Sequence, residues 1–562
     1  MVKRIAVLLV LLSLAGSAHA LNLELYFTDY LASQDRDIAP SAGVPVSYAD
    51  VKAVTFKTAD GRTMTYNDVE SLTVKPRVQV DVTTARIFAS PGEFEPVSFA
   101  LKLLEPAEQV FITSGPLIGP AGVIPKENVK ITSVEGYNGG DYQALMPLAA
   151  AWNMAGFSKE LFWTTVKVPA GAGAGLYRGT ITVTSNNVAV GKLTLELEVL
   201  PIKLAQVPVA LGYNYSNPKD PEALAAHFTD MREHGMTTVA PLYEWHMPIY
   251  DDDTRELGQL IEAYKKAGFK QPMMFATPMG LTVRDLVGYG PVDSQRFQRK
   301  YIEVMRKLWA EVQRHDVPVI FSIGDEMTNK GIEGVKMAGQ LARLVHEELP
   351  EIPTTSDMNG YMEVMAMAPY LNIATFNNGW DGIDRHNKGR QLINKDFILE
   401  VQKKGAIPWF VNASEGRFPF GFFLWKMSRY GVKGKVEWYY NLGDNSQGSV
   451  VMVKGPTVYP TLAYERSREG VDDLRYVTTL ENLIAECKKT GRATEETAAG
   501  EALLTRIADS IVDDWSAYSQ GGQRFPADGF DVMDPAKAAA IGHYQSMRRA
   551  VADAIIAIQF AR

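Results

Sequence analysis

Eight short apolar runs, each followed by a helical pattern, place the strongest constraint on the fold of this chain. The runs are strand-like and cover 210–215, 238–245, 272–277, 317–323, 354–358, 372–376, 407–412 and 435–440. The segments between them are amphipathic in the helical period. One example is the spacing by three and four of Phe297, Tyr301, Val304, Leu308 and Val312. Eight β/α units predict a (β/α)₈ barrel, like a triosephosphate isomerase barrel, at residues 206–460.

The regions on either side of the barrel have different patterns. Residues 21–205 carry short alternating segments, such as 78–82, 97–101, 179–184 and 193–199, separated by turn signals. This spacing predicts one or two β-sandwiches, followed by a linker between Pro201 and Pro208. Residues 461–562 have no strand signal and are expected to be helical. The expected fold class is therefore multidomain α/β plus β, with a helical carboxyl-terminal region.

The first twenty residues are typical of a secretory signal peptide. Lys3 and Arg4 precede an apolar core at 5–14, and Ala18 and Ala20 form a small-x-small cleavage site. We expect residues 1–20 to be removed and the protein to be exported, to the periplasm or outside the cell. The apolar core is too short to span a bilayer, and no later stretch approaches a membrane span, so no integral membrane segment is expected after signal removal.

Composition and motifs argue against several classes of partner and cofactor. The net charge of −8, from 57 Lys plus Arg against 65 Asp plus Glu, argues against nucleic acid as a partner. A single cysteine, Cys487, excludes an intramolecular disulfide. The chain has no H-E-x-x-H pair, Walker sequence, dinucleotide fingerprint or G-x-S-x-G elbow, so we expect neither a metal nor a cofactor. The sequence gives no indication of oligomeric state.

Two adjacent carboxylates end the fourth predicted barrel strand. The apolar run at 317–323 leads directly to Asp325 and Glu326, and carboxyl ends of barrel strands carry the chemistry of such enzymes. Helix capping is the alternative role, but the helical pattern restarts only at Ile332, which is too late for these residues to cap it. We therefore predict that both are catalytic. Neighbouring strand residues face opposite sides, so the backbone must leave β geometry here, and we expect Gly324 to permit it.

Aromatic, amide and charged residues gather at the other strand ends. The candidate substrate-binding residues are Tyr243, Glu244, Trp245, Asn359, Asn377, Trp380, Glu415, Arg417, Trp438 and Tyr439. Sugars stack their C–H faces on aromatic rings and bond their hydroxyls to fixed polar groups, so this mixture favours a glycan substrate. Trp409 lies inside a predicted strand and is expected in the core.

Five motifs resemble those of glycoside hydrolase family 123 and its relatives. They are 92–96 (GEFEP), 175–179 (GLYRG), 417–426 (RFPFGFFLWK), 434–438 (GKVEW) and 469–476 (EGVDDLRY), together with the Asp-Glu pair. The resemblance covers nearly all of the predicted mature chain. At the pair itself this chain has Gly324-Asp-Glu-Met327, where the family usually has Ser-Asp-Glu-Pro.

The resemblance implies an exo-acting, retaining hydrolase of a β-linked N-acetylhexosamine similar to N-acetylgalactosamine. By this mapping Glu326 is the general acid, and Asp325 orients and stabilises the 2-acetamido group as its carbonyl attacks the anomeric carbon. Such substrate-assisted enzymes are exceptions to the usual two-carboxylate scheme. The charge of Asp325 is expected to raise the pKa of Glu326, so that Glu326 keeps its proton.

Two other interpretations stay open from the sequence. In a double displacement on another sugar, Glu326 is the acid/base and Glu415 is the nucleophile, with carboxyl groups about 5 to 5.5 Å apart. Glu415 could instead bind a sugar hydroxyl or pair with Arg417. A protein that kept the barrel and lost the reaction, acting as a carbohydrate-binding or scaffold protein, is the alternative from a different class.

Overall fold

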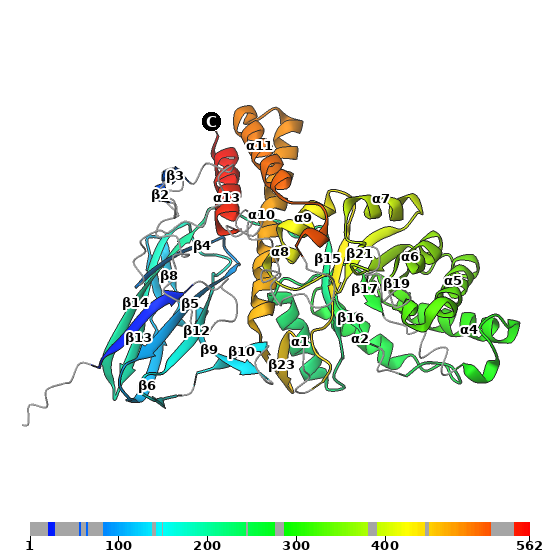
Figure 1. The fold of residues 1–562 in the computed structure, drawn as a ribbon, viewed down its shortest axis with the longest axis horizontal. Helices are drawn as coiled ribbons and strands as arrows, with labels where there is room; N and C mark the ends of the chain where they lie inside the picture. The colour runs from blue at the N-terminus through cyan, green and yellow to red at the C-terminus, as the bar shows by residue number, and fades with distance from the viewer. Residues whose placement is uncertain are drawn as a thin grey trace, which may run out of the picture.

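The computed structural model describes residues 21–28, 55–57, 63–65, 83–137, 142–148, 150–242, 246–275, 286–379, 391–443, 449–518 and 544–561. The predicted signal peptide, residues 1–20, lies outside this part. Figure 1 shows an amino-terminal β region, a barrel and a long helix, α10 (Leu462–Thr490), that runs between them. The expected fold class is confirmed.

Two sheets form the amino-terminal region. The first sheet has the order β1 (Leu23–Thr28), β5 (Phe94–Leu103), β12 (Lys159–Lys167), β9 (Val129–Tyr137) and β10 (Tyr142–Pro147). The second has the order β11 (Trp152–Met154), β6 (Ala107–Ser114), β13 (Gly175–Ser185), β14 (Val188–Val199) and β4 (Thr84–Ala89), with β7 (Leu117–Gly119) and β8 (Gly122–Ile124) beside β13. A separate hairpin pairs β2 (Thr55–Lys57) with β3 (Thr63–Thr65).

The two sheets share one apolar core. Phe99 of β5 stacks on Phe162 of β12, with ring centroids 5.0 Å apart, and both belong to the same buried cluster as Leu195 and Leu197 of β14. Alternate residues of a strand point to the same side, so each sheet contributes one apolar face. The strands of these two sheets therefore form a single sandwich.

Eight parallel strands form the barrel, in the order β16-β15-β22-β21-β20-β19-β18-β17. Their bounds are β15 (Ala210–Tyr215), β16 (Ala240–Pro241), β17 (Met273–Phe275), β18 (Val319–Asp325), β19 (Thr354–Met358), β20 (Ile373–Phe376), β21 (Ile407–Val411) and β22 (Gly434–Glu437). β16 and β17 are the two ends of this order, and they lie close enough to close the barrel almost completely, since Met274 N of β17 donates to Val239 O, just before β16, at 3.1 Å. β16 is shorter than predicted, and Pro241 has no N–H for a strand ladder.

A small apolar cluster fills the barrel interior. Its members come from seven of the eight strands and are Ala210, Ala240, Met274, Ile320, Ile373, Trp409 and Val436. Trp409 is buried there, which confirms the core prediction. Gly434 makes room for its indole, because a Cβ at that position would lie 2.2 Å from the ring.

Helices cover the outside of the barrel strands (Figure 1). They are α1 (Pro221–Glu233), α2 (Arg255–Lys266), α4 (Gln295–Val312), α5 (Gly331–Glu348), α6 (Tyr361–Met367), α7 (Lys395–Lys403), α8 (Arg417–Phe420) and α9 (Phe422–Ser428), with short 3₁₀ turns such as η4 (Met327–Lys330). A hairpin of β23 (Val451–Lys454) and β24 (Thr457–Pro460) precedes α10. The apolar stripe predicted on α4 is buried, as its spacing requires.

The carboxyl-terminal region packs against both of the other parts. It consists of α10, α11 (Thr494–Ser510) and α13 (Tyr544–Phe560), which lie together in Figure 1. Thr461 caps the start of α10 by accepting a hydrogen bond from Tyr464 N, and Gly491 ends the helix in the left-handed region. No helix in the described ranges is long and apolar enough to cross a membrane.

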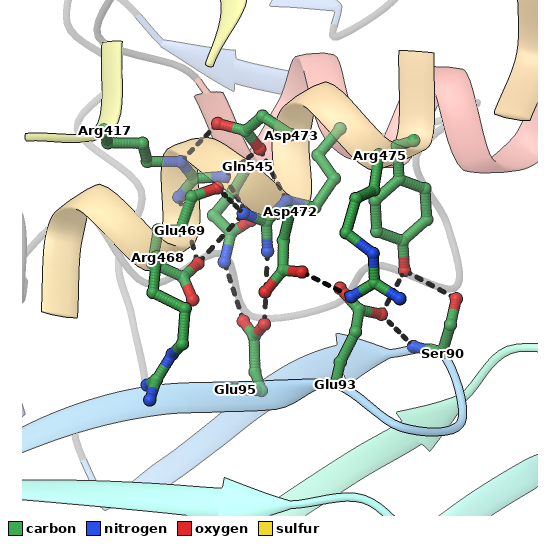
Figure 2. Close-up of polar contacts among 12 residues, drawn as sticks. Ser90, Glu93, Glu95, Arg417, Arg468, Glu469, Asp472, Asp473, Arg475 and Gln545 are labelled. Carbon is green, nitrogen blue, oxygen red and sulfur yellow. Dashed lines mark hydrogen bonds and ion pairs between the residues drawn. The ribbon is translucent and has the colours of Figure 1, made fainter. Parts of the chain in front are cut away.

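A buried ionic network ties the three parts together (Figure 2). We call it the junction network; its ionisable members are Glu93, Glu95, Arg417, Glu469, Asp473 and Arg548. Arg417 of α8 donates two hydrogen bonds of 2.7 Å to Asp473 of α10. Arg548 of α13 donates to Asp473 Oδ1 at 2.6 Å and to Glu95 Oε2 of β5 at 3.3 Å. The sandwich, the barrel and the helices thus meet at one set of desolvated charges.

Candidate active site

Glu326, at the end of β18, turns the backbone out of β geometry. Its φ and ψ are 44° and 52°, in the left-handed region, and its N donates to Asp357 O at 2.7 Å. The register of β18 with β19 shifts between Ser322 and Asp325, so the backbone leaves the regular ladder around Gly324 as expected, although the left-handed residue is Glu326 and not Gly324. The turn comes after Asp325 because η4 starts directly at Met327.

The capping alternative is not supported, although a helical turn starts earlier than predicted. η4 begins at Met327 and α5 at Gly331, not at Ile332. Glu326 occupies the position before η4, yet its side chain makes no capping hydrogen bond. Its carboxylate is engaged elsewhere.

Two side-chain amides hold the carboxylate of Glu326. Asn377, just after β20, donates to Oε1 at 3.2 Å, and Asn329 of η4 donates to Oε2 at 3.0 Å. Partial burial raises the pKa of Glu326, the neighbouring Asp325 raises it further, and the two amides oppose the shift. A raised pKa is what a general acid needs in order to carry a proton near neutral pH.

Asp325 lies beside Glu326 at the end of β18 and reaches solvent. Neighbouring protein atoms still displace part of the water around its carboxyl group, which raises the pKa of Asp325, and the positive charge of Lys330 lowers it. The pair thus consists of two carboxyl groups whose pKa values are both raised, with an ammonium group near one of them. Such a pair can divide the roles of acid and anion between its members.

Sequence reasoning missed two further carboxyl groups at this end of the barrel. Asp357 of β19 lies in register with Asp325, and burial together with three neighbouring carboxylates raises its pKa well above the usual value. Glu363 of α6 is fully buried and accepts hydrogen bonds from Met327 N at 2.7 Å and Asn359 N at 3.1 Å. Burial raises the pKa of Glu363 to about 8. Asp325 was identified because it follows a predicted strand at its carboxyl end. Asp357 lies near the carboxyl end of its strand too, but inside the predicted range 354–358, so it was not singled out.

Asn359 supports the loops around the pair. It is buried, and its Oδ1 accepts a hydrogen bond from Thr328 of η4. Its Nδ2 is buried without a partner among the described residues. The structure therefore brings Asp325, Glu326 and Asn377 together at the barrel mouth, with Asn359 behind η4.

Glu415 has different neighbours from Glu326. Burial and the charge of Glu437 raise the pKa of Glu415 well above its usual value, against the effect of Lys435. Its loop is attached to α10, because Gly416 N donates to Ser467 Oγ at 2.9 Å. The groups that shift the pKa of Glu326 are Asp325, Asn329 and Asn377, and Glu415 is not one of them.

Arg417 is part of the junction network and does not line the mouth. Its side chain is fully buried and is bonded to Asp473, so we correct its role from substrate binding to structural support. Trp438 is 45% exposed and packs edge-to-face on the mostly buried Tyr439, with centroids 5.0 Å apart. Trp438 can therefore offer a stacking surface. Tyr243, Glu244, Trp245 and Trp380 lie outside the described residues.

A pocket of about 340 Å³ lies elsewhere, between the sandwich, α1 and α10. It reaches Thr237, which precedes β16, so it opens at the opposite end of the strands from Glu326. None of the candidate residues lines it. No group of three or more His, Cys, Asp or Glu side chains in the described part of the chain could hold a metal ion.

Comparison with known proteins gives a match in fold. No family model and no curated protein matches the sequence. Among solved structures, a family 123 glycoside hydrolase from Clostridium perfringens, described for glycolipid glycan hydrolysis, matches with a TM-score of 0.61 at 12% identity, over 96% of this chain and 98% of that one. A family 39 glycoside hydrolase from Bacteroides cellulosilyticus matches over 69% of this chain and 81% of its own, at 11% identity and a TM-score of 0.36, too low to carry weight. Over almost its whole length, this chain has the fold of a family 123 glycoside hydrolase.

Proposed function

We propose that this protein is a retaining glycoside hydrolase that removes a terminal β-linked N-acetylhexosamine, similar to N-acetylgalactosamine, by substrate-assisted catalysis. The observation that carries the proposal is the pair at the end of β18. Glu326 leaves β geometry directly after Asp325, and its carboxyl group is held by Asn377 and Asn329. Two adjacent carboxyl groups can thus act on one sugar. The whole-chain likeness to the Clostridium perfringens enzyme supports a glycan as substrate.

The proposed reaction uses each member of the pair once in the first step. Glu326 gives its proton to the glycosidic oxygen as the bond to the leaving group breaks. The acetamido carbonyl oxygen forms a bond to the anomeric carbon, and Asp325 stabilises the positive oxazolinium ring that results. In the second step Glu326, now ionised, takes a proton from the water that opens the ring. Two inversions at the anomeric carbon give net retention.

Double displacement with Glu415 as nucleophile is the second candidate. A nucleophile must be ionised, whereas burial and Glu437 favour the protonated form of Glu415. Two carboxylates 5 to 5.5 Å apart also shift each other's pKa, and beside burial, which is the main cause, the carboxylate that raises the pKa of Glu326 is Asp325. Both observations favour Asp325 as the partner. A non-catalytic glycan-binding protein is the third candidate, and turnover separates it from the other two.

The direct test is hydrolysis of three aryl β-glycosides: the N-acetylgalactosaminide, the N-acetylglucosaminide and the galactoside that lacks the acetamido group. We expect release of the aryl group from an N-acetylhexosaminide, with the β-anomer as first product by NMR, and no release from the galactoside. Binding of these sugars without any release would establish the scaffold alternative. Equal rates on the galactoside and the N-acetylgalactosaminide would contradict substrate assistance.

We also propose that the protein is exported. The charged, apolar and small-x-small segments of residues 1–20 support this proposal. Amino-terminal sequencing of the protein from a bacterial periplasm or medium should begin at Leu21. Retention of residues 1–20 in the cytoplasm would contradict it.

A further inference from the structure

Asp357 lies on the inner face of the barrel, at the same end as the catalytic pair. Ile373 of β20 belongs to the interior cluster, and alternate residues share a face, so Thr375 also points inward. Asp357 is in register with Thr375, and Thr355, two residues earlier, bonds to Thr375 through their hydroxyls at 2.6 Å. Asp357 therefore follows Thr355 up the inner wall towards the mouth.

The two oxygens of Asp357 have different surroundings. Oδ1 is buried and has no hydrogen-bond partner within the described ranges, while the residue as a whole is only half-buried. An ionised carboxylate with one oxygen buried and no donor is costly. Protonation lowers this cost when Oδ1 is the neutral carbonyl oxygen and the other oxygen carries the hydrogen towards the mouth, since an unpaired charge costs more to bury than an unpaired neutral group.

The charges around Asp357 favour the same state. Asp325 of β18, Glu326 directly after it and Glu363 of α6 are the ionisable groups that act on it; all three are acidic, and no cation is among them. Thr375 of β20 is its uncharged neighbour on the other side. Asp357 thus lies among other carboxyl groups, with no cation beside it to stabilise a negative charge.

We propose that Asp357 is a further substrate-binding residue, a carboxylic acid that keeps its proton and donates a hydrogen bond to an oxygen of the bound N-acetylhexosamine. The inference rests on the proposed function for the identity of the sugar. Most carboxylates in sugar sites accept hydrogen bonds from hydroxyls. Here the neutral acid supplies a donor beside the catalytic pair without adding a second negative charge next to Asp325.

The test compares Asp357→Asn with Asp357→Ala. Asparagine keeps the shape and a neutral donor, whereas alanine removes the donor. We expect kcat/KM on the aryl β-N-acetylgalactosaminide to stay within about threefold of wild type for Asp357→Asn and to fall about tenfold for Asp357→Ala, the factor for one hydrogen bond. Calorimetric affinity for free N-acetylgalactosamine should follow the same order. As pH rises into the alkaline range, kcat/KM of Asp357→Asn should fall less than that of the wild type, because asparagine cannot ionise.

Each contrary outcome has a distinct meaning. If Asp357→Asn is as impaired as Asp357→Ala at pH 5, the anion is required and the inference is overturned. Equal affinity of all three proteins for N-acetylgalactosamine, or none in any of them, also overturns it. Graded affinity without turnover by the wild type would refute the proposed hydrolysis and support this inference. Melting temperatures should not fall in either variant, which separates binding from folding.

Discussion

Glu326 combines an unfavourable backbone conformation with a role at the mouth of the barrel. A residue with a side chain in the left-handed region costs on the order of 1–3 kcal/mol, and such residues gather at functional sites. Here the conformation is held by the bond from Glu326 N to Asp357 O and by the start of η4. The bend lets Glu326 reach Asn377 while Asp325 continues β18.

Replacing Glu326 tests its role as proton donor. Glu326→Gln should lower turnover by about 10²- to 10⁴-fold on a glycoside with a poor leaving group. The loss should be much smaller on an activated aryl glycoside, whose leaving group needs no proton. Steady-state kinetics on both substrates measure the difference. Glu333→Gln is a matched control, because Glu333 on α5 is exposed and pairs only with Lys336 among the described residues. Equal losses on both substrates would refute the assignment.

Among the elements, α10 connects the other parts of the molecule. Its residues Glu469 and Asp473 bind Arg417 at the start of α8 and Arg548 of α13. Arg548 in turn donates to Glu95 of β5 at 3.3 Å. Three of the motifs that resemble family 123, at 92–96, 417–426 and 469–476, therefore meet in this network. They mark the junction between domains, which explains why Arg417 was mistaken for a sugar ligand.

Breaking the junction network should reduce stability. Arg417→Met removes the positive charge that pairs with the carboxylates of Glu469 and Asp473. Removing one partner of a buried ion pair costs about 3–5 kcal/mol of stability. Chemical denaturation should show this loss in the free energy of unfolding. The control is Arg429→Ala, whose pair with Glu481 is exposed and should be worth less than about 1 kcal/mol. Unchanged stability with loss of glycan binding would restore Arg417 as a substrate ligand.

At the scale of the whole molecule, buried carboxyl groups make stability depend on pH. The pKa of Glu93 is raised to about 7 and that of Glu363 to about 8, mainly by burial, from 4.5. Between 4.5 and these values the folded state binds more protons than the unfolded state, so the free energy of unfolding falls as pH rises. His234, whose pKa is also raised by its acidic neighbours, acts in the same direction.

Denaturation at pH 5, 6.5 and 8 should therefore show decreasing stability. Glu363 alone contributes on the order of a few kcal/mol across this range. Glu363→Gln should make the slope shallower, even though glutamine cannot accept both backbone hydrogen bonds and starts from lower stability. Glu465 does not offset the trend, since its pKa of about 2 affects stability only at lower pH. Stability that is flat or rises from pH 5 to 8 would contradict these shifts.

Periodicity predicted much of the fold, because apolar alternation and helical spacing are local properties of the sequence. β15 and β19 begin and end where the pattern placed them, and Trp409 lies in the core as expected. The break in register across Gly324 was expected, but the left-handed turn at Glu326 was not, since a tertiary bond to Asp357 and the start of η4 decide it. Arg417 was misjudged and Asp357 was missed for a related reason. Which strand-end side chains face the mouth depends on packing against α10 and on strand register.

The central claim is that Asp325 stabilises a cyclised acetamido group, and a thiazoline mimic of that ring tests it most directly. The mimic should inhibit the wild type strongly, because the site is complementary to the intermediate. It should inhibit Asp325→Asn weakly, and that variant should lose kcat and kcat/KM together. A 2-deoxy-2-fluoro glycoside should leave no covalent adduct by mass spectrometry. Indifference to the thiazoline, with a trapped ester on Glu415, would contradict the account and make Glu415 the nucleophile.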